Sequence, residues 1–140
     1  MTEKLMEYFN KQPRLGTLST ADKNGKVNSA YFGSPRMIAE NIIFMGIGKN
    51  RTFANLLENS NAVFLVMEPA EALPDWKGLR IYVKMTNHDT SGEDYEKIIA
   101  ELTPRVGEET ARKMIHAAVT FVIEEVRPLV DMGQGWEKSI

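Results

Sequence analysis

The chain has 140 residues, a length that suits one domain with its own hydrophobic core. Charged residues make up 26% of it and the net charge is -2, so no basic excess indicates a nucleic-acid partner. Cysteine is absent, which excludes disulfides, thiolate catalysis and zinc sites with sulfur ligands. The N-terminus is polar and the apolar runs are too short to span a bilayer, so we expect a cytoplasmic protein without membrane contact.

The first half of the chain predicts a helix, four short strands and a second helix. The turn at Asn24-Gly25 is a strong hairpin signal, and a second hairpin is expected around Glu40-Asn41. Helical spacing of apolar residues and strand alternation give the approximate limits. The expected helices are 2–11 and 52–57, and the expected strands are 14–20, 26–32, 36–39 and 41–47.

The second half predicts two more strands, a pair of helices, a last strand and a polar tail. Residues 62–67 are almost wholly apolar, as in a strand that is buried on both faces. Thr103-Pro104 is read as the start of the second helix of the pair, since proline is favoured at the first helical position. The expected elements are strands 62–67 and 79–87, helices 91–102 and 103–117, strand 118–129 and a tail from about 130 to 140.

This order of elements favours one mainly β domain with flanking helices. Most successive strands lack a helix between them, which fits an antiparallel sheet and not a parallel one. Short strands joined by hairpins often close into a barrel. We therefore expect a single domain over residues 1–140, with an antiparallel sheet that curls into a barrel.

The most informative stretch is a strand that ends at Gly48 and is followed by Lys49, Asn50, Arg51 and Thr52 at the start of a helix. A helix start offers free backbone N–H groups and the positive end of the helix dipole. Arginine can grip two phosphate oxygens, lysine adds a point charge and threonine a hydroxyl. This corner suits a phosphomonoester, although a solvated turn with Asn50 or Thr52 as a simple helix cap explains the same residues.

The hairpin over residues 15–31 and the stretch 44–67, followed by the strand 78–85, resemble the pyridoxamine 5′-phosphate oxidase-like family of FMN-binding split barrels. The similarity covers roughly residues 5–128, and the chain most resembles the short members of the family. The resemblance implies a six-stranded antiparallel split β-barrel. It also implies a homodimer with flavin mononucleotide (FMN) at the interface.

The resemblance also assigns candidate cofactor-binding residues. The turn of Lys49, Asn50, Arg51 and Thr52 matches the family's phosphate site. A strand beside the flavin ring and a backbone stretch near the ribityl chain or ring complete the set, which consists of Asn28, Ser29, Ala30, Tyr31, Met45 and Gly46. The expected function is that of an FMN-dependent oxidoreductase or an electron-transfer flavoprotein, in which the flavin supplies the redox chemistry.

Alternatives remain for both the ligand and the activity. A barrel of the same family that binds haem or a deazaflavin, as a sensor or carrier and not an enzyme, fits the same pattern. No second set of Arg, Lys or His residues suits the phosphate of pyridoxamine phosphate, so we do not expect that oxidase activity. No catalytic acid, base or nucleophile is evident, and the substrate and electron donor are not assigned.

Trp136 and the two histidines are the remaining candidate residues. Trp136, in the tail, either lies over the flavin or in the dimer contact, or packs on its own surface. His88 is expected in a turn and His116 on a helix, and neither shows metal-ligand spacing, so we expect no metal site.

Overall fold

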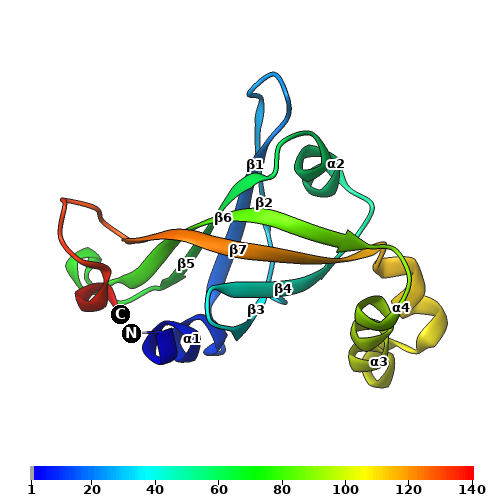
Figure 1. Ribbon diagram of the computed structural model, residues 1–140. Helices are drawn as coiled ribbons and strands as arrows, with labels where there is room; N and C mark the ends of the chain where they lie inside the picture. Colours follow the sequence, from blue (N-terminus) through cyan, green and yellow to red (C-terminus); the bar gives the residue numbers. More distant parts are fainter. Residues whose placement is uncertain (1) are drawn as a thin grey trace.

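A computed structural model describes residues 2–140 and shows one curled, seven-stranded antiparallel sheet with helices at its ends and on one side (Figure 1). The strand order is β2-β1-β5-β6-β7-β4-β3, so β2 and β3 are the two unpaired edges. The strands are β1 (Leu15–Ala21), β2 (Val27–Tyr31), β3 (Arg36–Ala39), β4 (Ile42–Ile47), β5 (Asn61–Glu68), β6 (Lys77–Asp89) and β7 (Ala117–Pro128).

The mainly β class and the antiparallel pairing expected from the sequence are confirmed, but the six strands implied by the resemblance are too few, because the sheet has seven. Strand β3 is a separate element of four residues, and it pairs with β4 across the Glu40-Asn41 turn. Asn41 adopts a positive φ of 59°, which asparagine tolerates better than most residues. Because β2 and β3 do not pair with each other, the barrel is split along this seam and not closed.

The core lies inside the curl of the sheet and is closed at both ends by helices. Phe9 of α1 (Thr2–Asn10) and Leu56 of α2 (Arg51–Glu58) are buried in the same cluster as the inward side chains of the strands. Along β4 the burial alternates, with Ile43, Met45 and Ile47 pointing inward. The two helices therefore occupy opposite ends of one hydrophobic core (Figure 1).

The helical pair α3 (Glu93–Val106) and α4 (Glu108–Met114) packs outside the barrel, against β4 and β7. The boundary expected at Thr103-Pro104 is wrong, because α3 continues through Pro104. The backbone N–H of Gly107 reaches the Thr103 carbonyl at 2.8 Å, so helical bonding resumes beyond the proline. The break falls at Gly107, whose φ of +84° suits glycine and ends the helix.

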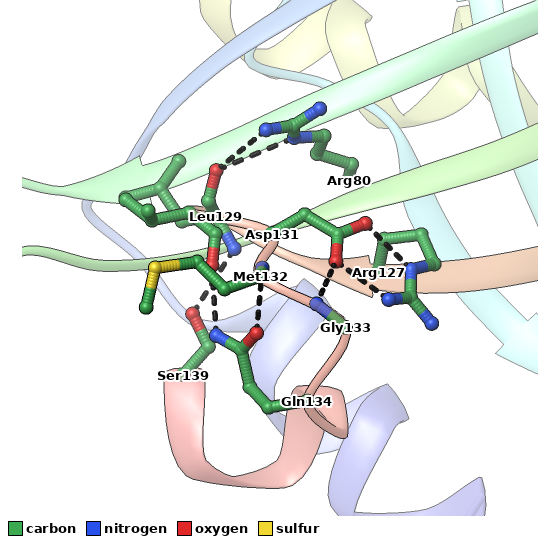
Figure 2. A network of polar contacts seen from close by, with 9 residues as sticks. Arg80, Arg127, Leu129, Asp131, Met132, Gly133, Gln134 and Ser139 are labelled. Carbon is green, nitrogen blue, oxygen red and sulfur yellow. Dashed lines mark hydrogen bonds and ion pairs between the residues drawn. The ribbon is translucent and has the colours of Figure 1, made fainter.

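The tail after β7 is folded onto the sheet by a network of polar contacts (Figure 2). Arg127 grips the Asp131 carboxylate with two bonds of 2.6 and 2.7 Å, and the backbone N–H of Gly133 adds a third bond of 3.0 Å. Ser139, in the short helix η2 (Trp136–Ser139), donates to the Gly78 carbonyl at 2.7 Å. Trp136 is half-buried against the core cluster, so the tail packs on its own chain.

We expect the fold of the tail to depend on the charge of Asp131. The Arg127 guanidinium, helped by the Gly133 N–H, holds the pKa of this carboxyl well below its usual range. A depressed pKa means that the contact stabilises the tail above about pH 4, the ordinary value for aspartate, and is lost as the pH falls further. The Asp131→Asn variant should mimic protonation at pH 7 and speed amide hydrogen exchange over residues 130–139.

The matched control for the tail is Glu109→Gln, which removes an exposed ion pair to Lys113 on α4. Exchange in the tail should be unchanged in this variant. Equal protection of the tail in Asp131→Asn and in the original chain would contradict the role given to the Arg127–Asp131 contact.

Among the residues described, none of the helices is both long and apolar enough to cross a membrane. The loop between β5 and β6 contains a single helical turn, η1 (Leu73–Asp75). Its Trp76 donates its indole N–H to the Ala70 carbonyl at 2.9 Å, so the loop is held by a contact within itself.

Candidate functional site

The corner between β4 and α2 has the geometry of an anion-binding helix start. Asn50 is the N-cap of α2, and its side-chain oxygen accepts the backbone N–H of Phe53 at 2.9 Å. Asn50 therefore caps the helix, as one of the two alternatives for this stretch predicted. It occupies one of the free donors of the helix start, while the N–H groups of Arg51 and Thr52 form no hydrogen bond within residues 2–140.

The cations of this corner are available to a ligand. The side chains of Lys49 and Arg51 are exposed, and within residues 2–140 neither forms an ion pair. Thr52, in contrast, is only 2% exposed, and its hydroxyl accepts a long bond of 3.4 Å from the Asn28 amide. Two exposed cations without an ion pair in the described chain therefore lie beside two backbone donors and one buried hydroxyl that can still donate its proton.

The Asn28–Thr52 contact joins two stretches that lie 24 residues apart in the sequence. Strand β2 alternates, so Asn28 and Ala30 face the inner side of the sheet while Ser29 and Tyr31 face outward. The structure thus places Asn28, which the resemblance assigned to a strand beside the flavin ring, next to Thr52 at the corner between β4 and α2. It places Ser29 and Tyr31 on the outer face of the sheet.

The cap and the proposed anion contact can be separated at Asn50. Asn50→Ala should cost about 1 kcal/mol of stability, because a helix donor loses its partner. Asn50→Asp should keep the cap, and hence the stability, but place a negative charge beside the anion site. Urea unfolding would measure the first effect, and titration with a phosphate-bearing ligand the second. Equal ligand affinity in Asn50→Asp and the original chain would contradict the placement of the anion.

Both histidines lie against α2, in positions that differ from the expected ones. His88 is on strand β6 and not in a turn, and His116 is in the two-residue connection before β7 and not on a helix. Each packs edge-on against Phe53, with ring centroids 5.7 and 5.3 Å apart. Packing between distant segments brings the two histidines to Phe53, and local sequence patterns do not report such packing. In the part of the chain described, no group of three or more His, Asp or Glu residues could hold a metal ion.

A cleft of about 800 Å³ opens beside β3, β4 and α3. Met45 and Gly46 line it, together with residues 33–36, which lead from the end of β2 into the start of β3. Its wall is apolar at Phe44 and Ile98, and two cations from distant parts of the sequence, Arg36 and Arg105, lie on its lining. Local sequence patterns do not predict this cleft, because α3 supplies one wall and no such pattern shows where α3 packs.

Within the cleft the two predicted residues have different surroundings. The Met45 side chain points into the core and is 2% exposed. A Cβ at Gly46 would lie 2.7 Å from the Ile98 side chain, so glycine is required here by the close packing of α3. Packing therefore explains why methionine and glycine stand at positions 45 and 46. Only the backbone atoms of these two residues can contact a ligand in the cleft.

The segment that lines the cleft is held in place by polar contacts from α1 and β1. The Asn10 side chain donates to the Met37 carbonyl at 2.9 Å and accepts the Met37 N–H at 2.8 Å. Arg14 donates to the Pro35 carbonyl at 3.1 Å and lies over the Phe9 ring. Burial lowers the pKa of the Arg14 guanidinium. These contacts hold the cleft wall in place, and no local sequence pattern indicates them.

The predicted residues thus lie in four places in one chain. Asn28 and residues 49–52 meet at the corner, Met45 and Gly46 line the cleft, Ser29 and Tyr31 face outward, and Trp136 lies in the tail. Ala30 shares the face of Asn28. Helix η2, which carries Trp136, lies at the far end of the sheet from α2 (Figure 1).

Residues 1–129 match the family model described as pyridoxamine 5′-phosphate oxidase. The chain belongs to this family. Among solved structures, it is 27% identical to an FMN-binding protein from Syntrophomonas wolfei subsp. wolfei, with a TM-score of 0.76 and with 92% of this chain and 86% of that chain covered. No curated protein matches the sequence.

Other solved structures with this fold are more distant in sequence. HupZ of Group A Streptococcus is 19% identical, with a TM-score of 0.72 and with 92% of this chain and 94% of that one covered. HutZ, a haem storage protein from Vibrio cholerae, is 20% identical, with a TM-score of 0.64 and with 89% and 92% covered. These likenesses show the fold alone. The names of these proteins give different ligands, FMN for the Syntrophomonas wolfei protein and haem for HutZ.

Proposed function

We propose that this chain is an FMN-binding flavoprotein that acts as an oxidoreductase or an electron carrier. The observation that supports the proposal most directly is the start of α2, where Lys49 and Arg51 have no ionic partner in the described chain and two backbone N–H groups are free. This donor set fits a phosphate dianion. The likeness to an FMN-binding protein at 27% identity supports the choice of FMN.

The residues of this chain divide the work of holding such a ligand. Arg51 and Lys49 would neutralise the phosphate, the N–H groups of Arg51 and Thr52 would orient it, and the Thr52 hydroxyl would donate a further bond. Asn28 holds Thr52 from the side of β2. Because Thr52 and Phe53 are buried, this part of the corner is rigid before the ligand arrives, which lowers the entropic cost of binding.

We propose that the ring end of the ligand would lie in the cleft beside β4. Gly46, on the cleft lining, and Lys49 are three residues apart, a reach of about 10 Å in extended chain. The cleft volume of about 800 Å³ falls within the range of small-molecule sites. Bound FMN would supply hydride or electron transfer, and the chain would position the ring and exclude water from the apolar wall at Phe44 and Ile98.

The spectrum of the purified protein tests the proposal. We expect a yellow protein that bleaches on reduction and releases FMN on denaturation, identified by mass. After its cofactor has been removed and the chain refolded, the protein should regain the flavin spectrum when FMN is added. An intense haem band, a deazaflavin spectrum, or a colourless protein that ignores FMN would each refute the proposed cofactor.

A further inference from the structure

The cleft beside β4 has an apolar end and a charged end. Four residues of α3 line it at the spacing i, i+3, i+4 and i+7, which places them on one helix face. They are Ile98, Glu101, Leu102 and Arg105. Ile98 packs on Gly46 at the apolar end. Seven residues of helix rise about 10 Å, so Arg105 marks the other end of the cleft, away from the close contact at Gly46.

Strand β3 supplies the opposite side of the charged end. Arg36 is the register partner of Phe44 on β4, and both residues line the cleft. The Arg36 guanidinium lies 3.6 Å from the Glu101 carboxylate, and both side chains are more than half exposed. A long and exposed ion pair of this kind contributes little to stability, so a ligand can rearrange it at low cost. We call Arg36, Glu101 and Arg105 the charged end.

Arg105 is the cation of the charged end that has no partner. It is exposed, and within residues 2–140 its guanidinium forms no ion pair. Two arginines against one glutamate give the cleft lining a net charge of +1. The phosphate corner differs, because Lys49 and Arg51 together carry two positive charges that no acid in the described chain neutralises. The corner therefore suits a dianion, and the charged end of the cleft suits a monoanion.

The rest of the lining favours an apolar body on that anion. Phe44, Ile98, Leu102 and Ile115 pack on the second core cluster but stay partly exposed. Ile38 on β3 also lines the cleft and is 55% exposed. The volume of about 800 Å³ lies in the upper part of the usual range for small-molecule sites, so the cleft has room for more than one ring system. Apolar walls that converge on a few charged groups are typical of such sites.

We propose that the charged end of the cleft binds a small carboxylate with an apolar body, and that Arg105 holds the carboxylate group. A planar guanidinium can donate two parallel hydrogen bonds to the two oxygens of a carboxylate. Arg36 adds attraction, while Glu101 repels a second negative charge and so disfavours a phosphate ester at this place. The site is derived without reference to FMN. Its role as the place where a substrate meets the flavin rests on the proposed function.

Calorimetric titration with 1-naphthoate, an aromatic carboxylate, tests this site. The neutral probe 1-naphthalenemethanol has the same ring system and should bind about tenfold more weakly, because it lacks the charge-assisted bonds. Arg105→Gln should lower the affinity for 1-naphthoate by about tenfold. Glu101→Gln should raise it several-fold, since a like charge is removed and Arg36 is released. These opposite shifts, from two residues one turn apart on α3, would not arise from a loss of helix packing.

Two controls accompany the titration. Lys97→Gln removes an exposed cation on the same helix but outside the cleft lining, and it should leave the affinity for 1-naphthoate unchanged. The affinity for the neutral probe should be the same in all variants. The proposal would be overturned if 1-naphthoate does not bind, if both probes bind equally well, or if Arg105→Gln has no larger effect than Lys97→Gln.

The same titration separates this site from the proposed cofactor. Binding of 1-naphthoate that depends on Arg105, in a chain that does not bind FMN, would support the charged end and refute the cofactor. A yellow protein that releases FMN on denaturation but takes up no 1-naphthoate would support the cofactor and refute the carboxylate site. When both proposals hold, addition of 1-naphthoate should shift the flavin absorption band without release of FMN.

Discussion

Replacement of Arg51 by alanine is expected to weaken FMN binding by about tenfold or more. A charge-assisted hydrogen bond contributes about 1.5–3 kcal/mol, and each 1.4 kcal/mol corresponds to a factor of ten. Arg51 has no partner within residues 2–140 that would be left unpaired by its loss, so the change should act on the ligand and not on the fold. Quenching of flavin fluorescence would measure the dissociation constant.

Riboflavin makes this test specific for the phosphate. It has the ring and the ribityl chain of FMN but no phosphate, so its affinity should be nearly the same in Arg51→Ala and the original chain. Lys97→Ala is the matched control, since Lys97 is an exposed cation on α3 with a long ion pair of 3.9 Å. Equal loss of FMN and riboflavin affinity would place Arg51 at the ring, and no loss of either would refute the phosphate corner.

Truncation of Phe121 to alanine is expected to cost about 3–5 kcal/mol of unfolding free energy. Phe121 is fully buried on β7, and its ring meets Phe64 edge-on at a centroid distance of 5.3 Å. Phe64 in turn meets Phe9 of α1 at 5.8 Å. The three rings pack in a row from α1 through β5 to β7, so a cavity at Phe121 removes packing from the Phe64 ring and weakens the row. Because small domains are stable by only about 5–15 kcal/mol, the loss would be a large share of the total.

Urea unfolding of the ligand-free protein would measure the effect of Phe121→Ala. Leu57→Ala is the control, because Leu57 is exposed on α2 and an alanine there should change the stability by at most about 0.5 kcal/mol. A cost below about 1.5 kcal/mol for Phe121→Ala would contradict the packing described for the barrel core.

Local patterns in the sequence predicted the elements well. The strand-turn-helix order at the corner, the hairpin at Asn24-Gly25 and the alternation of β6 all depend on residues a few positions apart, and the structure confirms the element type of each. The error at Pro104 arose because a proline was read as a helix start although the preceding turn stays helical and the real stop is Gly107. Propensity is a weak guide where a neighbouring sheet holds the helix in place.

By itself, the sequence determined the class of the fold, the position of the cationic corner and, through the order of loose motifs, the family. The tertiary structure alone decided that β5 lies between β1 and β6, that Asn28 meets Thr52, and that α3 makes a cleft with β4. The physical reason is the separation along the chain over which each interaction acts. Side-chain periodicity reports which face of an element is apolar, but the partner of that face is chosen by packing between segments that are far apart in the chain.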